Sequence, residues 1–298
     1  MPLVLDPGEG DAIELDQLVT MLDATPFDVR DDASFAEVGP LLARLGRNGR
    51  FLTDLAIEEL KTRFARQEET SAYGAQVLML RPAHGRYVLR ANFWPARDDA
   101  VVRASGTAPF FYDLPHDHNF PFLTYGYLGP GYWSDYYEFG GAEDALPGDP
   151  AHLRFIERSR LEPGKLMLYR AHRDVHVQLP PDAFSVSLNI LGYHRAQPWR
   201  SQYRFDIASD TITAALTTTP SEALATLAAQ FGGGNGLDLV HHLLRGHPSA
   251  RMRRTALDAL AATADGPDER MRVYEAALGD PAVGRHARQR LDRIRNGC

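Results

Sequence analysis

Cysteine is almost absent from this chain of 298 residues, since Cys298 is the only one. One cysteine excludes an intrachain disulfide and a zinc site built from several thiolates. Long apolar runs are missing too, because nowhere do about 18 apolar residues follow one another. Residues 1–16 also lack a basic start followed by an apolar segment. We therefore expect a cytoplasmic protein that does not contact a membrane.

Positive charge is scarce as well. The chain has 39 acidic and 32 basic residues, which gives a formal net charge of −7. Nucleic acids bind basic surfaces, so a general nucleic-acid binder is excluded. The remaining composition, with 44% hydrophobic and 24% charged residues, is typical of a globular protein. A chain of this length favours one large domain and a smaller one.

Hydrophobic periodicity predicts an α+β protein with three parts. Residues 1–70 have helical spacing and form an N-terminal helical segment that packs on a barrel, with Asp32 or Ser34 as N-cap of a helix to about Leu45. Residues 71–210 alternate with period two and form the barrel. It opens with a hairpin from AQVLML and GRYVLRANFWP and continues with strands in PFFYDL, FLTYGYL, YWSDYYEF, KLMLYRA, DVHVQL and FSVSLNIL.

Residues 219–298 form the third, helical part. Thr219 as N-cap, Pro220 at the first helical position and Glu222 at the third mark the start of a helix. Further on, Met252, Arg254, Ala256 and Leu260 recur 31 residues later as Val283, Arg285, Ala287 and Leu291. This self-similarity indicates helical-repeat packing, and the segment DPAVGRHARQRL resembles half of a HEAT-type repeat.

The segment LPHDHNF carries the strongest chemical signal. In an extended strand, residues two apart point to the same face, so His116 and His118 can direct both imidazoles at one point. Such a pair can hold a metal ion or can be two hydrogen-bonded core residues. His118 is followed by the predicted strand at 122–128 and by a glycine turn at 129–131. This arrangement resembles the first motif of the cupin superfamily.

A second segment, EPGKLMLYRAHRDVHVQL, resembles the second cupin motif. There Pro163 and Gly164 precede a strand and His176 follows thirteen residues after Pro163. The resemblance covers about residues 75 to 205 and implies an antiparallel double-stranded β-helix, the cupin jelly roll. It implies that His116, His118 and His176 bind a metal ion, as in the three-histidine thiol dioxygenases, which also place helices before the barrel.

Two residues leave the ligand set open. Many cupins have a glutamate about five residues after the second histidine, and here that place is Leu123. Glu138 could be a fourth ligand, a general base or a surface carboxylate. His172 lies four residues before His176 and competes with it, although its spacing fits the motif less well. We rank His172 as a pocket residue that contacts substrate or a ligand imidazole.

The pocket lining follows from strand parity. Arg90 and Asn92 share a face of one strand, and Arg90 could bind a substrate carboxylate or be a surface or ion-paired residue. Tyr125 is a candidate for substrate binding, and Tyr136 for moving protons; either phenol could instead be core.

We therefore expect a metal-dependent cupin oxygenase. The resemblance favours Fe(II), with Mn, Ni, Co, Zn and Cu as alternatives. Its substrate would be a small polar, amino-acid-like molecule, with dioxygen as the second reactant, and the barrel could form a homodimer. Two alternatives stay open: a non-oxidative isomerase, epimerase or hydrolase, and a ligand-sensing cupin without activity whose helical tail binds a partner.

Overall fold

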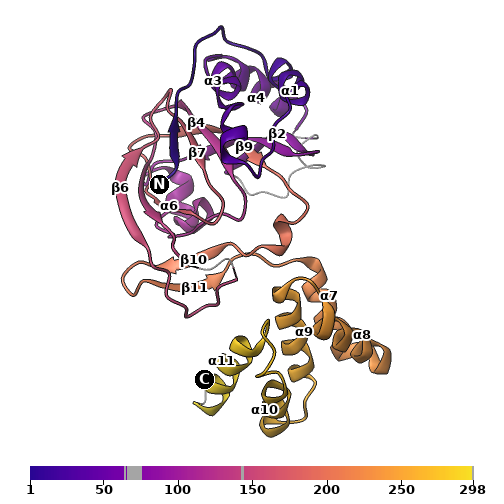
Figure 1. Cartoon of the computed structure of the whole chain (residues 1–298). Helices are drawn as coiled ribbons and strands as arrows, with labels where there is room; N and C mark the ends of the chain where they lie inside the picture. The colour runs from indigo at the N-terminus through magenta and orange to yellow at the C-terminus, as the bar shows by residue number, and fades with distance from the viewer. Residues whose placement is uncertain (64, 66–75, 142–143, 297–298) are drawn as a thin grey trace. The chain divides into compact units, whose positions relative to one another are not determined.

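The computed structural model describes residues 1–63, 65, 76–141 and 144–296, so Cys298 and parts of the predicted first and second domains lie outside the described residues (Figure 1). The chain divides into two compact units. The first comprises Met1–Gly141, Pro147–Gln197 and Gln202–Ala214, and the second Ala142–Leu146, Pro198–Ser201 and Ala215–Cys298. No helix in these described ranges is long and apolar enough to cross a membrane.

The first unit contains a six-stranded sheet, sheet A, whose strands pair antiparallel in the order β1-β7-β4-β9-β3-β2. Its strands are β1 (Leu3–Leu5), β2 (Val77–His84), β3 (Tyr87–Trp94), β4 (Phe122–Leu128), β7 (Leu166–Tyr169) and β9 (Ser185–Gly192). The predicted hairpin is confirmed, because β2 and β3 pair directly.

Sheet B is a smaller antiparallel sheet with the order β6-β5-β8. Its strands are β5 (Trp133–Glu138), β6 (Arg154–Arg160) and β8 (Asp174–Gln178), and a separate pair is formed by β10 (Tyr203–Asp206) and β11 (Thr211–Ala215). One buried cluster joins both sheets, since Trp94, Phe122 and Tyr169 of sheet A pack in it with Tyr136 of sheet B. The two sheets therefore face each other across this cluster.

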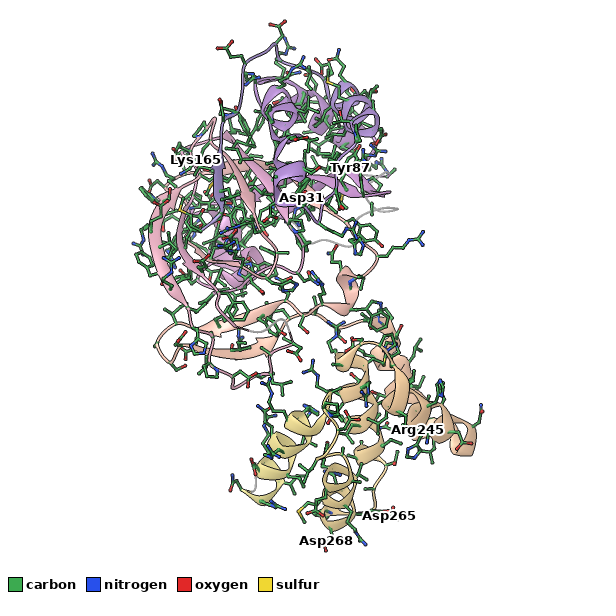
Figure 2. The ribbon with its side chains drawn as sticks, in the orientation of Figure 1. Asp31, Tyr87, Lys165, Arg245, Asp265 and Asp268 are labelled. Carbon is green, nitrogen blue, oxygen red and sulfur yellow. The ribbon has the colours of Figure 1, made fainter. Side chains whose placement is uncertain are left out.

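Helices cover the other face of sheet A. They are α1 (Leu15–Ala24), α2 (Asp32–Ala36), α3 (Gly39–Gly46) and α4 (Phe51–Lys61), and Figure 1 shows α1, α3 and α4 grouped beside the strands of this sheet. Their apolar residues form one core with those of the sheet, for example Leu42 with Leu123 and Leu188. The cap is neither of the predicted residues but Asp31, labelled in Figure 2, which accepts hydrogen bonds from the backbone of Ala33 and Ser34. The single helix predicted to about Leu45 is two helices, α2 and α3.

The second unit consists of helices in its described residues: α7 (Pro220–Phe231), α8 (Gly233–Gly246), α9 (Ala250–Ala262), α10 (Pro267–Ala276) and α11 (Gly284–Arg295). The predicted start of α7 is confirmed, because Thr219 and Glu222 form a capping box. The 31-residue echo falls on matching buried positions, with Ala256 and Leu260 in α9 and Ala287 and Leu291 in α11. The HEAT-type assignment itself stays a prediction.

The mixture of helices with antiparallel sheets confirms the α+β class, whereas the cupin jelly roll stays a prediction. One predicted strand is wrong: PFFYDL forms no strand, and its first two residues belong to the short 3₁₀ helix η1 (Ala108–Phe110). The strands β1, β6, β10 and β11 were not predicted. Two further short elements complete the described chain, α6 (Ala100–Ser105) and the 3₁₀ helix η2 (Gln197–Trp199).

A close contact between α3 and β4 supplies a test of this packing. A Cβ added at Gly46 would overlap the buried ring of Tyr125, whereas one added at Gly49 would meet no atom within 4 Å. We expect Gly46→Ala to destabilise the protein by about 1–3 kcal/mol, because overpacking forces the ring and helix apart. Chemical denaturation of Gly46→Ala beside the control Gly49→Ala measures this. Equal midpoints for the two variants would contradict the packing of α3 on β4.

A candidate metal centre

Two backbone hydrogen bonds bring the predicted ligands together. The N–H of His116 donates to the carbonyl of His176 at 3.1 Å, and the N–H of His176 donates back to the carbonyl of His116 at 3.0 Å. These bonds form an isolated antiparallel bridge rather than a continuous strand. Directly opposed residues of such a bridge point to the same side, so both imidazoles leave the backbone in one direction. His118 lies two residues further along and joins them.

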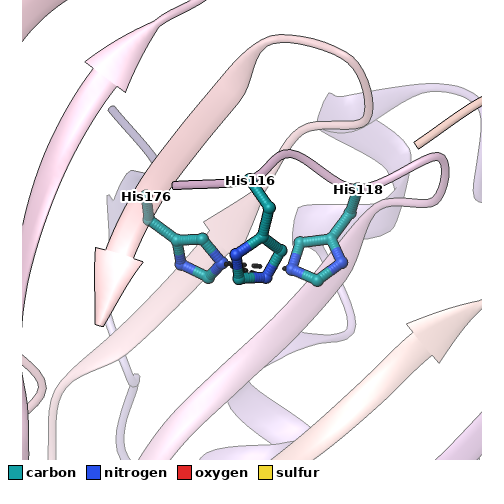
Figure 3. A group of neighbouring side chains, drawn as sticks. All are labelled: His116, His118 and His176. Carbon is teal, nitrogen blue, oxygen red and sulfur yellow. Dashed lines mark hydrogen bonds between the residues drawn. The ribbon is translucent and has the colours of Figure 1, made fainter. Parts of the chain in front are cut away.

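The three imidazoles converge on one point (Figure 3). The Nε2 atom of His176 lies 3.1 Å from Nε2 of His116 and 3.2 Å from Nε2 of His118. One nitrogen from each ring lies within 4.8 Å of the other two. Nitrogens about 2.0–2.1 Å from one metal ion are about 2.9–3.4 Å apart at bond angles between octahedral and tetrahedral. The two Nε2 distances fit that range.

Hydrogen bonding among neutral rings does not explain both short contacts. The Nδ1–H of His116 donates to the carbonyl of Leu114 at 2.8 Å, which leaves Nε2 of His116 with a lone pair. If Nε2 of His176 carries a proton and donates it to His116, that nitrogen has no lone pair for His118. If it carries none, two lone pairs face each other. A cation between the three nitrogens removes this conflict, so the residues fit a metal ion.

Burial keeps these imidazoles in the form that binds metals. It lowers the pKa of His116, although the bond to Leu114 opposes the shift. It also lowers the pKa of His118 and His176 well below 6.5, and in His118 the charges of the two other rings and of Arg90 add to the effect. Neutral imidazole is the metal ligand, so the protein environment favours coordination.

A pocket of about 260 Å³ opens onto His116 and His118. Its apolar wall is aromatic and its polar wall consists of amides and one guanidinium. The remaining lining residues are Gln76, Val77, Arg90, Asn92, Trp94, Pro109, Phe111, Phe120, Phe122, Tyr132, Gln178, Asn189 and Gln202. The structure thus places two predicted substrate-binding residues, Arg90 and Asn92, beside two predicted ligands.

Glu138 does not join this cluster, and its roles as fourth ligand and base are not supported. Its carboxylate accepts hydrogen bonds from Arg173, at 2.7 Å, and from Arg154. These bonds lower the pKa of Glu138 to about 2, so the group is an ion-paired carboxylate at the end of β5. Strand parity predicted the direction of this side chain but not the two arginines that bind it.

His172 is close to the centre without belonging to it. Its backbone N–H donates to the carbonyl of His118 at 2.9 Å. Its ring faces Asp117 instead, with Nδ1 at 3.6 Å from Oδ2 of that carboxylate. Among the described residues, His172 belongs neither to the group of three histidines nor to the pocket lining. The choice of His176 over His172 as ligand is therefore the one that the geometry supports.

The two predicted tyrosines lie outside the pocket lining. Tyr125 faces the helices and packs in the core that they form with sheet A. Tyr136 is fully buried, and its hydroxyl bonds the hydroxyl of Tyr169 at 2.9 Å. Burial raises the pKa of Tyr136 to about 12, and its ring packs in the buried cluster between the two sheets.

Tyr132 is a pocket residue that the sequence reasoning missed. It lines the pocket and is buried, and burial raises its pKa. A signal for it existed, because Tyr132 has the same parity as Ser134 and Tyr136 and immediately follows the glycine turn. Extending the parity argument two residues towards the N-terminus would have identified it.

Comparisons with known proteins add little to this geometry. No family model matches the chain, and no curated protein matches it. Among solved structures, the DMSP lyase DddQ from Ruegeria pomeroyi DSS-3 is similar over 65% of this chain and 78% of that chain. The two share 11% sequence identity with a TM-score of 0.26, a likeness that carries no argument about fold or activity. The assignment of the site rests on the positions of the histidines.

Metal content tests the centre directly. We expect His116→Ala and His176→Ala to lower the metal bound after anaerobic purification at least about tenfold, because two imidazoles cannot replace three. His172→Ala is the matched control and should keep its metal. Elemental analysis of all four proteins measures this, and equal metal in every sample would refute the site.

Because burial lowers the pKa values of the three histidines, wild-type protein should also keep its metal somewhat below pH 6.5.

Proposed function

We propose that this chain is a metal-dependent enzyme, a non-haem Fe(II) oxygenase acting on a small anionic substrate. The observation that carries the proposal is the convergence of three imidazoles, two of which line a pocket. Three ligands leave up to three positions open on an octahedral ion, enough for a substrate and dioxygen together. Bound Fe(II) would let electrons pass from the substrate to dioxygen and so remove the spin barrier to their reaction.

The side chains of the pocket would select and hold the substrate. Arg90 and His118 line the same pocket, so an anionic group bound to this guanidinium would share the pocket with the metal centre. A guanidinium has five N–H donors, and a contact to the protein leaves others for a carboxylate. Phe120 and Phe122 pack against the His118 ring, the first tilted and the second edge-on, with centroid distances of 5.0 and 4.9 Å. These rings exclude water from that side of the centre.

A second candidate is a non-oxidative enzyme in which the metal is a Lewis acid. The observation that favours it is the phenol of Tyr132 in the pocket wall. Because burial raises the pKa of Tyr132, this phenol is protonated at neutral pH and would donate a proton rather than accept one. Such a group suits a lyase or an isomerase better than it suits an oxygenase.

Two measurements on the full-length protein test these candidates: the first tests for an open position on the metal ion, and the second separates the oxygenase from the non-oxidative enzyme. Fe(II)-loaded protein should bind nitric oxide, a surrogate for dioxygen, and give the electron paramagnetic resonance signal of an iron nitrosyl, whereas Zn(II)-loaded protein should not. The second is substrate-dependent oxygen uptake with a panel of small carboxylates, measured at an oxygen electrode.

For the oxygenase we expect uptake that disappears in Arg90→Met, which keeps the length of the side chain but removes its charge, while His172→Ala keeps the activity. Conversion of a carboxylate at the same rate without oxygen would contradict the oxygenase and favour the second candidate. The Tyr132→Phe variant would then lose that anaerobic activity.

A further inference from the structure

The inner face of sheet A is polar where it meets the pocket. In the register of the sheet, Arg90 and Thr124 lie opposite Asn189, and Asn92 lies opposite Ser187. Opposed residues of antiparallel strands share a face, so all five point away from the helices and towards sheet B. Inner faces of packed sheets are normally apolar. This band of polar side chains therefore indicates a surface that binds a ligand through hydrogen bonds.

Two donors beside this band are bonded to protein acceptors, while two amide oxygens of the pocket lining are left over. The indole N–H of Trp94 donates to Ser187 Oγ at 3.0 Å, and the amide N–H of Gln76 donates to the carbonyl of Phe110 at 3.3 Å. By contrast, Asn92 Oδ1 and Gln178 Oε1 have no hydrogen-bond partner among the described residues.

Both of these side chains are 6% exposed and line the pocket. Asn92 comes from sheet A and Gln178 from sheet B, so the two free oxygens belong to opposite walls. Buried oxygens without a partner are costly unless a ligand supplies the hydrogens.

Charge decides which donor fits. The described residues that line the pocket include one cation, Arg90, beside the two histidines of the candidate metal centre. A metal ion adds further positive charge. An ammonium group bound by the two amide oxygens would share the pocket with this metal ion and would be repelled by its charge. Hydroxyl groups supply the same hydrogen bonds without that cost.

We infer that the substrate is a small dihydroxy carboxylate. Its carboxylate pairs with Arg90, and its two hydroxyl groups donate hydrogen bonds to Asn92 Oδ1 and Gln178 Oε1. The inference rests on the proposed function, whose substrate it defines further. It replaces the amino-acid-like substrate expected from the sequence, because a pocket of this charge does not favour an amino group.

The test uses four-carbon acids that differ by one group at a time: butanoate, 3-hydroxybutanoate, 3,4-dihydroxybutanoate, 2,3-dihydroxybutanoate and 4-amino-3-hydroxybutanoate. Isothermal titration of Zn(II)-loaded full-length protein avoids turnover. We expect each hydroxyl to tighten binding about tenfold, in line with the usual strength of a hydrogen bond to a buried acceptor. The better of the two dihydroxy acids should bind tightest, and the amino compound should bind at least about tenfold more weakly than 3,4-dihydroxybutanoate.

Variants then show which side chains bind the hydroxyl groups of the substrate. Asn92→Leu and Gln178→Met should each remove about tenfold of the preference for the dihydroxy acid over butanoate. Each of them removes an unpartnered buried oxygen, so we expect no loss of folding, which thermal unfolding checks. Gln197→Met is the matched control, since it removes another such oxygen that is not in the pocket lining.

Three results would overturn the inference. The first is that butanoate and both dihydroxy acids bind equally, or that none of them binds. The second is that the preference for the dihydroxy acid survives in both variants, which would assign the hydroxyl groups to the metal. The third is that the amino compound binds more tightly than 3,4-dihydroxybutanoate. The titrations are repeated on metal-free protein, and metal content is measured in parallel. If the chain holds no metal but the preference persists, the proposed function fails and the inference stands; if metal is held and the preference is absent, the inference alone fails.

Discussion

The pair of backbone hydrogen bonds between His116 and His176 is the constraint on which the candidate site depends. It joins segments 60 residues apart in the chain and adds the His116 segment to the edge of β8, whose other edge is paired with β5. Side chains alternate between faces along extended backbone, so a slip of one residue would turn the His176 imidazole away from the other two. The register of one bridge thus decides whether three nitrogens converge.

Local signals and strand parity made much of this predictable. The Thr219 capping box needs only residues close in sequence, and it is present as predicted. His116 and His118 were expected on a strand, and although the structure forms only a bridge there, an extended backbone is sufficient for both rings to point the same way. The pairing with His176 came from spacing that resembles a family, because nothing local to His176 identifies its partner.

The errors have physical causes of two kinds. Glu138 has the parity of Tyr136, but its carboxylate is bound by Arg173 and by Arg154 of β6, a charged strand whose sequence gives no apolar alternation. Tyr125 was assigned to the pocket because it lies on a strand that follows the predicted ligands. In the structure this strand, β4, is buried on both faces, so period two does not show which face lies towards the helices. In both cases the missing information was long-range packing.

The two faces of sheet A differ in composition, because one stabilises the fold and the other carries the pocket. Towards the helices, β4 and β9 present Leu123, Leu188 and Ile190, which bury apolar surface and stabilise the fold. Towards sheet B the same strands present Thr124, Ser187 and Asn189, of which Thr124 Oγ1 has no partner among the described residues. A core selected for stability alone would replace these polar residues with aliphatic ones. Their presence on only one face, the face that carries the pocket, indicates that this surface serves binding while the opposite surface maintains the fold.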